Sequence, residues 1–239
     1  MIIPAAGLGT RMASAPPGSK AKKPAATKQF TELGGTPILI HTLRKFVANP
    51  EVSEIFIALR ANEIDGFLAR LQKEAKDILQ KQIHLVEGGD HRQHSVSNAM
   101  RSVSAIDDDI VLVHDAVRPF VTEEIIHDVI QAAYKYGAAI AALPAVDTVK
   151  QVERTSDGAL ITATLPRERV VLAQTPQGFR YDVLKKAFDE ATRDGFVGTD
   201  EASLVERSGH AVAVVMGSSS NIKITTPADM ELAEFYLKK

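Results

Sequence analysis

The sequence predicts an α/β fold in which helices cover both faces of an open, twisted, mostly parallel sheet. Short apolar runs alternate with longer segments of helical periodicity, which is typical of repeated strand–helix–strand units. The chain has 239 residues, a length that suits one such domain and is ample for a core. Its composition, with 45% hydrophobic and 24% charged residues, is that of an ordinary globular protein.

The strands of this sheet are predicted by six apolar runs, at residues 2–5, 55–59, 83–86, 110–113, 138–143 and 211–215. The helices between them should begin at residues whose side chains cap a helix, namely Thr36, Asn62, Asp90, Thr122 and Thr226. Thr36 and Thr226 each precede a proline, which is favoured at the first helical position. Thr122 precedes two glutamates, so acids lie at the positive end of that helix.

One region departs from this alternation. Residues 146–174 are rich in Val, Thr and Leu and contain a Ser156-Asp157-Gly158 turn, which is typical of a β-hairpin. We expect residues 145–170 to form a protruding β-arm on a single domain that spans residues 1–239. Because an arm has little of its own chain to pack against, we expect it to pair with a second subunit in a homodimer.

The composition excludes several classes of function. The absence of cysteine excludes disulfides, thiolate chemistry and cysteine-ligated zinc. A net charge of -2 gives no reason to expect nucleic acid or an acidic membrane surface as a partner. No apolar run approaches the roughly 20 residues of a membrane span, and no signal peptide precedes the first motif. We therefore expect a cytoplasmic enzyme, although a processed plastid protein would look the same.

The opening segment concentrates positive charge, with five lysine and arginine residues and no acid in the first 31 positions. A short strand, a glycine turn and a basic loop form the layout of a phosphate site, because glycine lets backbone N–H groups approach an anion. The sequence lacks the Gly-Lys pair of a P-loop and the HRD-type loop of a kinase, and Met12 replaces the Gly or Ala of a dinucleotide fingerprint. A loop that grips a triphosphate is favoured over a solvated surface loop.

Eight motifs occur in order between Pro4 and Glu234: "PAAGLGTRM", "KQF", "EGGDHRQHSV", "VLVHDAVRPF", "DTVK", "TPQGF", "TDEASLVE" and "NIKITTPADMELAE". In this combination the chain resembles the 2-C-methyl-D-erythritol 4-phosphate cytidylyltransferase family of the non-mevalonate isoprenoid pathway. The resemblance implies a Rossmann-like nucleotidyltransferase fold and transfer of CMP from CTP to 2-C-methyl-D-erythritol 4-phosphate, with release of pyrophosphate. The attacking phosphate monoester is already ionised, since its second pKa is about 6. Such a site needs cations to stabilise the α-phosphate more than it needs a general base.

The resemblance also implies roles for individual residues. The catalytic cations are Arg11, Lys28, Arg167 and Lys223. The groups near the base and ribose of CTP are Ala5, Ala6, Gly7, Gly9, Gly89, Asp90, Ser95 and Ala116. The groups near the acceptor are Arg118, Thr148, Arg167, Thr175, Thr199 and Lys223. Asp115 follows the apolar run 110–113 and is the expected ligand of a Mg²⁺ ion that accompanies CTP.

Some of these assignments leave alternatives. Thr27 precedes Lys28 where the family has proline, and the loop is longer, so Lys20, Lys22 and Lys23 compete with Lys28. Arg118 either binds phosphate or pairs with Asp115. Arg167 is expected to reach the site of the partner subunit. A lone lysine in an uncharged strand needs an anionic partner, which favours a role for Lys223.

Other features are interpreted as structural. Asp107, Asp108 and Asp109 precede a strand and should form a solvated turn, and His91 and His94 have no third metal ligand nearby. The alternative functions are a ribitol-5-phosphate (pentitol phosphate) cytidylyltransferase and a catalytically inactive nucleotide-binding regulatory module. The stretches "AAGLG" and "TDEASLVE" disfavour the first, and the number of cations disfavours the second. Met12 disfavours a nicotinamide dehydrogenase.

Overall fold

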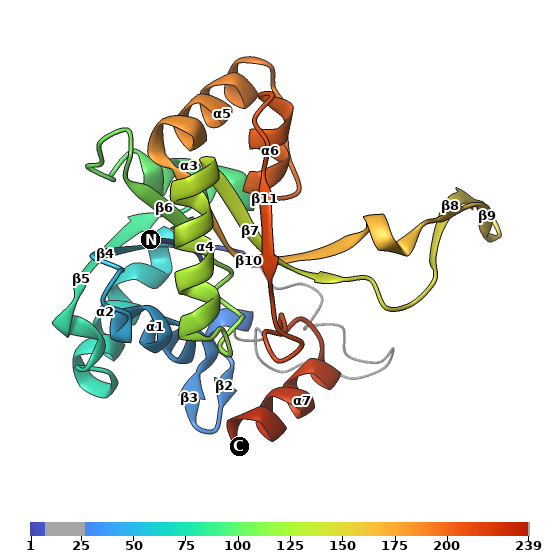
Figure 1. Cartoon of the computed structure of the whole chain (residues 1–239). Helices are drawn as coiled ribbons and strands as arrows, with labels where there is room; N and C mark the ends of the chain where they lie inside the picture. Colours follow the sequence, from blue (N-terminus) through green and yellow to red (C-terminus); the bar gives the residue numbers. More distant parts are fainter. Residues whose placement is uncertain (8–26, 239) are drawn as a thin grey trace.

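A twisted sheet runs through the centre of the protein, in a computed structural model that describes residues 1–7 and 27–238. The described part of this sheet has seven strands in the order β11-β7-β10-β6-β1-β4-β5 (Figure 1). Their bounds are β1 Ile2–Pro4, β4 Glu54–Leu59, β5 Gln82–Glu87, β6 Ile110–Val113, β7 Ala138–Pro144, β10 Val171–Arg180 and β11 Ala213–Met216. All six predicted runs form strands of this sheet, which confirms the expected α/β architecture.

β10 is the strand of the central sheet that the apolar runs did not predict. It lies antiparallel between β6 and β7, whereas the other neighbouring pairs are parallel. Its pairing with β7 shifts register between Ala173 and Gln177, around Pro176. Proline cannot donate to the ladder, and its presence argues against a central strand unless the register is interrupted in this way.

The helices lie on both faces of the sheet (Figure 1). They are α1 Ile38–Ala48, α2 Ala61–Glu74, α3 Arg92–Met100, α4 Glu123–Tyr136, α5 Tyr181–Arg193, α6 Glu201–Arg207 and α7 Pro227–Leu237. Short 3-10 turns occur at η1 Lys28–Phe30, η2 Ile78–Gln80 and η3 Arg167–Arg169. The expected doubly covered sheet is therefore confirmed.

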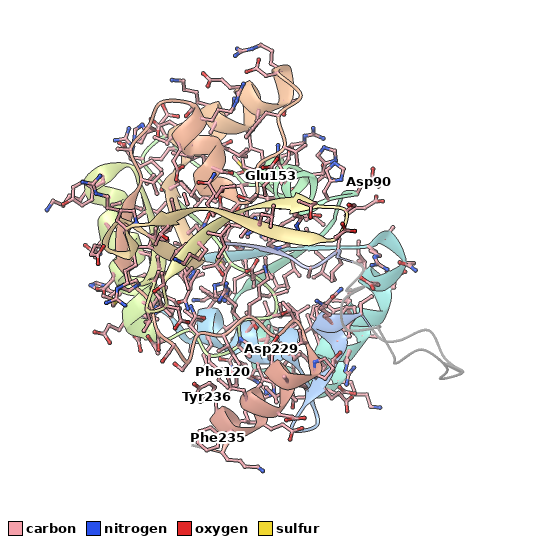
Figure 2. All side chains as sticks on the ribbon, turned by 90° about the vertical axis from the view of Figure 1, so that its right-hand side faces the viewer. Asp90, Phe120, Glu153, Asp229, Phe235 and Tyr236 are labelled. Carbon is pink, nitrogen blue, oxygen red and sulfur yellow. The ribbon has the colours of Figure 1, made fainter. Side chains whose placement is uncertain are left out.

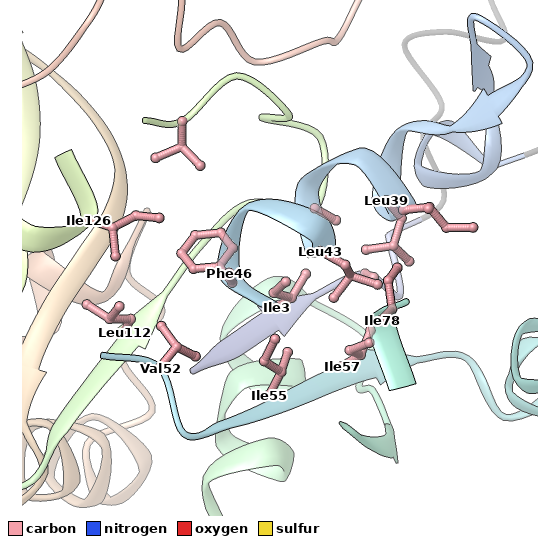
Figure 3. Packing of buried hydrophobic residues seen from close by; sticks show 14 of the residues in the cluster. Ile3, Leu39, Leu43, Phe46, Val52, Ile55, Ile57, Ile78, Leu112 and Ile126 are labelled. Carbon is pink, nitrogen blue, oxygen red and sulfur yellow. The ribbon is translucent and has the colours of Figure 1, made fainter. Parts of the chain in front are cut away.

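Two apolar cores follow from the alternation of side chains along the strands. Ile3, Ile55 and Ile57 pack against Leu43 and Phe46 of α1 (Figure 3). The neighbouring positions point the other way: a second core joins Ile2, Phe56, Val111 and Val113 to side chains of α3, α5 and α6, which include Val96, Leu184, Phe188 and Val205. The sheet thus has a buried core on each face.

Two of the five predicted helix starts are confirmed. The Thr122 hydroxyl accepts a hydrogen bond from the Ile125 N–H at 3.3 Å, and Thr226 forms a capping box with Asp229 at the start of α7. The other three predictions, Thr36, Asn62 and Asp90, are wrong. Thr36 and Pro37 form β3 (Thr36–Pro37), which pairs with β2 (Glu32–Leu33), and α1 starts one residue later. The caps of α2 and α3 are Arg60 and His91, because the chain enters α2 directly after β4 and enters α3 two residues after the glycine turn at 88–89.

Residues 149–165 form a hairpin that projects away from the sheet (Figure 1). Its strands are β8 Val149–Thr155 and β9 Gly158–Leu165, joined at the predicted turn. In Figure 2 the hairpin, with Glu153 labelled, crosses in front of the body. Apolar side chains on it are unusually exposed, at 49% for Val152, 66% for Leu160 and 65% for Ile161.

The described residues include no helix that is both long and apolar enough to cross a membrane. The last helix, α7, packs against the rest of the chain through aromatic side chains. The Phe120 and Tyr236 rings are 5.6 Å apart, centroid to centroid, and lie together at the foot of the molecule in Figure 2.

Candidate active site

A cavity of about 300 Å³ opens beside the carboxyl ends of β1, β5 and β6. Ligand sites of α/β proteins occur at this edge of the sheet. Ten of the residues predicted from the sequence line the cavity: Ala5, Ala6, Gly7, Lys28, Gly89, Asp90, Ser95, Asp115, Ala116 and Lys223. Gly9 and Arg11 lie outside the described residues, as do Lys20, Lys22 and Lys23.

The backbone of one cavity wall is fixed by side chains that the sequence reasoning did not assign. The Ala5 N–H donates to the Ala58 carbonyl of β4 at 2.8 Å, and the Gln29 side-chain amide donates to the Ala5 carbonyl. The Arg60 Nε donates to the Ala6 carbonyl at 3.0 Å. These contacts satisfy both carbonyls and fix the backbone of residues 5 and 6, and because both residues are alanines, this stretch of the wall presents no long side chain.

The glycine turn after β5 packs against Ala6 and continues the lining of the cavity. The Gly89 N–H donates to the Ser95 hydroxyl oxygen at 3.1 Å, and Ser95 is buried. A Cβ at Gly88 would lie 2.4 Å from the Ala6 Cβ, and one at Gly89 would lie 2.4 Å from the His94 Cβ. Both glycines are therefore required for packing, whatever else they contact. Asp90 is exposed at the rim (Figure 2).

Asp115 is the centre of a cluster of cations. Its Oδ1 is 3.3 Å from the Arg92 Nε, and its Oδ2 is 3.2 Å from the Arg118 Nε and 3.0 Å from the Lys223 Nζ. Burial by itself would raise the pKa of the Asp115 carboxyl, but the three cations outweigh it and hold that pKa well below its ordinary value. Asp115 therefore remains ionised at neutral pH. Arg118 also donates to the Asn221 carbonyl at 2.8 Å, so of its two predicted roles the ion pair with Asp115 is present.

Lys223 lies in the loop between β11 and α7, so the prediction that it belongs to a strand is wrong. Lys223 has an anionic partner within the protein, Asp115, and its expected contact with the incoming phosphate stays a prediction. The Lys223 side chain is 39% exposed, compared with 10% for Arg118 and 28% for Arg92. Lys223 is thus the member of the cluster with the most freedom to contact a ligand.

Arg92 and Glu201 form a contact that sequence reasoning missed. The Arg92 Nη1 donates to both carboxylate oxygens of Glu201, at 2.6 and 2.7 Å. Glu201 is buried; that burial raises the pKa of its carboxyl, and the charge of Arg92 opposes the rise. One signal was available, because Arg92 lies in the first turn of a helix, where the macrodipole disfavours a cation.

A second cavity, of about 190 Å³, adjoins this cluster. It shares Arg92, Asp115 and Lys223 with the first cavity and adds three residues predicted to contact the acceptor, Arg118, Thr175 and Thr199. The cation cluster therefore lies at the junction of two cavities, as a reaction between two ligands requires.

His114 fixes the backbone beneath this junction. Its Nε2 is 3.0 Å from the Arg118 carbonyl, which can only accept, so Nε2 carries the proton and Nδ1 accepts from the Thr175 hydroxyl at 3.1 Å. The Thr175 oxygen in turn accepts from the Asp115 N–H at 3.0 Å. Burial lowers the pKa of His114 to about 4, so the ring is neutral at pH 7 and this arrangement of donors is stable.

Two predicted residues line neither cavity of their own chain. Thr148 immediately precedes β8, and Arg167 lies in η3, where its Nη1 donates to the Val146 carbonyl at 2.8 Å and its side chain is 57% exposed. Within residues 1–7 and 27–238, no group of three or more His, Cys, Asp or Glu residues could hold a metal. The turn at 107–109 is exposed, in agreement with its interpretation as solvated.

Comparison with known proteins extends over the whole chain. The family model described as "IspD: 2-C-methyl-D-erythritol 4-phosphate cytidylyltransferase" matches residues 1–239. A protein of that name from Acidobacterium capsulatum is 56% identical over 239 residues, which are 100% of this chain and 97% of the relative. One from Solibacter usitatus is 51% identical, over 100% of this chain and 95% of the relative.

Solved structures give the same result. The Francisella tularensis 2-C-methyl-D-erythritol 4-phosphate cytidylyltransferase (IspD) is 37% identical, with a TM-score of 0.78 over 98% of this chain and 97% of that one. The 4-diphosphocytidyl-2C-methyl-D-erythritol synthase of Anaerococcus prevotii is 31% identical, with a TM-score of 0.79 over 100% of this chain and 97% of that one. The fold is thus the Rossmann-like nucleotidyltransferase fold. This chain belongs to the 2-C-methyl-D-erythritol 4-phosphate cytidylyltransferase family.

Proposed function

We propose that the protein transfers CMP from CTP to 2-C-methyl-D-erythritol 4-phosphate and releases pyrophosphate. The main structural support for this proposal is the cluster at Asp115, where three cations meet between two cavities. Family membership supports both the reaction class and the two substrates. We treat residues 1–239 as one transferase domain, with 145–170 as its arm.

The larger cavity is the proposed site of CTP. Its wall of small residues and fixed backbone suits the flat base and the ribose, because long side chains would obstruct them. Lys28, from η1, lies in the same wall and is placed to contact the phosphates. The residues that we assign to the nucleotide are Ala5, Ala6, Gly7, Gly9, Gly89, Asp90, Ser95 and Ala116, with Arg11 and Lys28 on the triphosphate.

The smaller cavity is the proposed site of the acceptor, with Arg118, Thr175, Thr199 and Lys223 around it. We assign Thr148 and Arg167 to the acceptor site of a second subunit, because neither lines the CTP or the acceptor cavity of its own chain. The exposed apolar side chains of the hairpin support a homodimer that buries them. Sedimentation at low micromolar concentration should give a dimer, and a monomer alone would contradict this assignment.

The chemistry follows from the charges. An oxygen of the acceptor phosphate attacks the α-phosphorus of CTP in line, the new P–O bond forms, and the bond to the bridging oxygen of the leaving pyrophosphate breaks. No proton has to move, because the attacking phosphate is ionised. Negative charge accumulates on the α-phosphate oxygens, and preorganised lysine and arginine groups stabilise it. Asp115 holds Lys223 in place until the acceptor phosphate competes for it.

The donor set fits a Mg²⁺ ion that enters with the triphosphate. Magnesium is commonly held by one or two carboxylates together with substrate phosphates. Asp115 is ionised and lines the cavity, and a contact with the ion requires that Lys223, the most exposed of its partners, moves to a phosphate. When bound, Mg²⁺ would neutralise phosphate charge.

Pyrophosphate release with CTP, Mg²⁺ and each acceptor separately tests the proposal. We expect release with 2-C-methyl-D-erythritol 4-phosphate and little with ribitol 5-phosphate. Release with ribitol 5-phosphate alone would favour the pentitol enzyme, and CTP binding without any release would indicate a regulatory module. The named relatives are bacterial proteins, and a cytoplasmic location of this chain stays a prediction.

A further inference from the structure

Arg92 joins three segments that are distant in sequence. Arg92 is the first residue of α3. Its Nε donates to Asp115, which follows β6, and its Nη1 donates to Glu201 at the start of α6, 109 residues away in the sequence. The guanidinium lies in the wall shared by both cavities. The proposed transfer of CMP counts Arg92 among the cations around Asp115 and assigns no role to Glu201.

A glutamate at position 201 lowers the stability of the fold through the free-energy cost of burying its carboxylate. Its side chain is 1% exposed, and Arg92 is its ion-pair partner in the described part of the chain. A buried carboxylate loses its hydration, and a buried pair of this kind adds less to stability than well-packed apolar side chains do. Packing alone therefore gives no reason for a glutamate here.

The start of α6 is also anchored without Glu201. Asp200 forms a capping box with Ser203, and the Gln177 side chain bridges the Asp200 carboxylate at 2.8 Å and the Ala202 N–H at 3.1 Å. Removal of the Glu201 charge would leave all of these contacts in place. The contact that depends on Glu201 is the one with Arg92.

We infer that Glu201 is a positioning residue for the transfer reaction and acts through Arg92 on Asp115 and Lys223. This inference rests on the proposed function. Because Glu201 occupies the Nη1 of Arg92, Arg92 offers its Nε to one oxygen of Asp115, and the other oxygen stays with Arg118 and Lys223. Without Glu201 the guanidinium would pair with both oxygens of Asp115, the geometry it prefers with a carboxylate, and would compete with Lys223.

The expected consequence is a misplaced ammonium group beside the reacting phosphates. A displacement of about 1 Å in a catalytic constellation can cost about a hundredfold in rate. For Glu201→Gln, which keeps the volume and removes the charge, kcat should fall about 10- to 100-fold while the KM for CTP changes less than about threefold. Glu201→Asp keeps the charge and should recover part of the loss.

The matched control is Asp77→Asn. It removes a carboxylate from an arginine at the same kind of distance, 2.8 Å from Arg44, but on the surface, where the two side chains are 40% and 51% exposed. Its kcat should equal that of the unmodified protein. An equal loss in Glu201→Gln and in this control would contradict the inference.

A double-mutant cycle separates positioning from packing. In an Asp115→Asn background the link from Arg92 to Lys223 is already broken, so Glu201→Gln should cost less than about twofold there. If Glu201 served only in packing, Glu201→Gln would lower kcat by the same factor in both backgrounds and would also lower the thermal midpoint of unfolding. That result would overturn the inference. If Glu201→Gln does not fold, Arg92→Lys is the alternative variant, because it keeps the positive charge and loses the paired N–H donors of the guanidinium. It should show the same loss of kcat, and full activity would overturn the inference.

The unmodified protein distinguishes the two hypotheses. If it transfers no CMP to the acceptor, the proposed function fails. If it does so and Glu201→Gln is equally active, only the inference about Glu201 fails.

Discussion

Lys223→Met tests the proposed role of the most exposed cation in the Asp115 cluster. Methionine keeps most of the length and apolar stem of the side chain and removes the charge. The Lys223 Nζ is 3.0 Å from the Asp115 Oδ2 and lies in the walls of both cavities, so it can exchange this carboxylate for an incoming phosphate without a large movement.

The size of the effect follows from the charges. Two unit charges 4 Å apart attract by about 4 kcal/mol at an effective dielectric constant of about 20, which suits a site near the surface. The 39% exposure of the Lys223 side chain places it in this regime. Loss of one preorganised donor in other enzymes costs about 10²- to 10³-fold in kcat, or about 3–4 kcal/mol. We therefore expect a loss of about 10²- to 10³-fold in kcat/KM.

The assay is steady-state release of pyrophosphate with CTP, Mg²⁺ and varied acceptor. Lys185→Met is the matched control, because Lys185 is 55% exposed and pairs with Asp189 on the surface of α5. Thermal unfolding checks that both variants fold. If Lys223→Met retained kcat/KM within about threefold of the control, the electrostatic reasoning would be refuted.

Three further predictions concern other parts of the chain. Lys28→Ala should lower kcat about 10²- to 10³-fold by removing a preorganised charge; full turnover with collapsed CTP binding would make Lys28 a binding residue only. Phe46→Ala should destabilise the fold by about 3–5 kcal/mol in urea unfolding, because Phe46 is fully buried; a loss below about 1 kcal/mol would contradict the core assignment. His114→Gln tests pH dependence: the folded protein keeps His114 neutral down to about pH 4, so the unfolded chain binds the extra proton below about pH 6.5. The stability of the unmodified protein should therefore fall by up to about 3 kcal/mol more than that of His114→Gln between pH 6.5 and 4, and parallel pH curves would contradict the burial of a neutral ring.

The strands were predictable because an apolar run of strand length, bounded by turn residues, is buried in an α/β chain most readily as a strand of the central sheet. β10 was missed because Pro176 and Gly178 occupy its centre, and only the tertiary structure reveals the shifted register that accommodates the proline. The helix starts at Thr36 and Asn62 were wrong because the geometry of the preceding strand, not the best capping residue, decides where the chain turns.

A contact in the site was predictable where a charged side chain stands alone in an uncharged segment, because such a charge requires a partner of opposite sign. Lys223 in an uncharged segment required an anion; a phosphate was the expected one, and the folded protein places Asp115 3.0 Å from its Nζ. The Arg92–Glu201 contact was not predictable in this way, because it joins residues 109 positions apart, and the unfavourable place of Arg92 at the start of a helix does not reveal its partner. Motif resemblance identified the residues around the cavity, but the cation cluster at their junction emerged only from the folded chain.

A crystal structure of the protein with CTP and Mg²⁺ tests the central claim most directly. We predict that the Lys28 Nζ lies within about 3 Å of a phosphate oxygen of CTP, the distance of a charge-assisted hydrogen bond, and that the Lys223 Nζ leaves Asp115 for a phosphate oxygen once the acceptor is added. Both ammonium groups pointing to solvent, more than about 10 Å from the triphosphate and thus beyond the screening length, would contradict it.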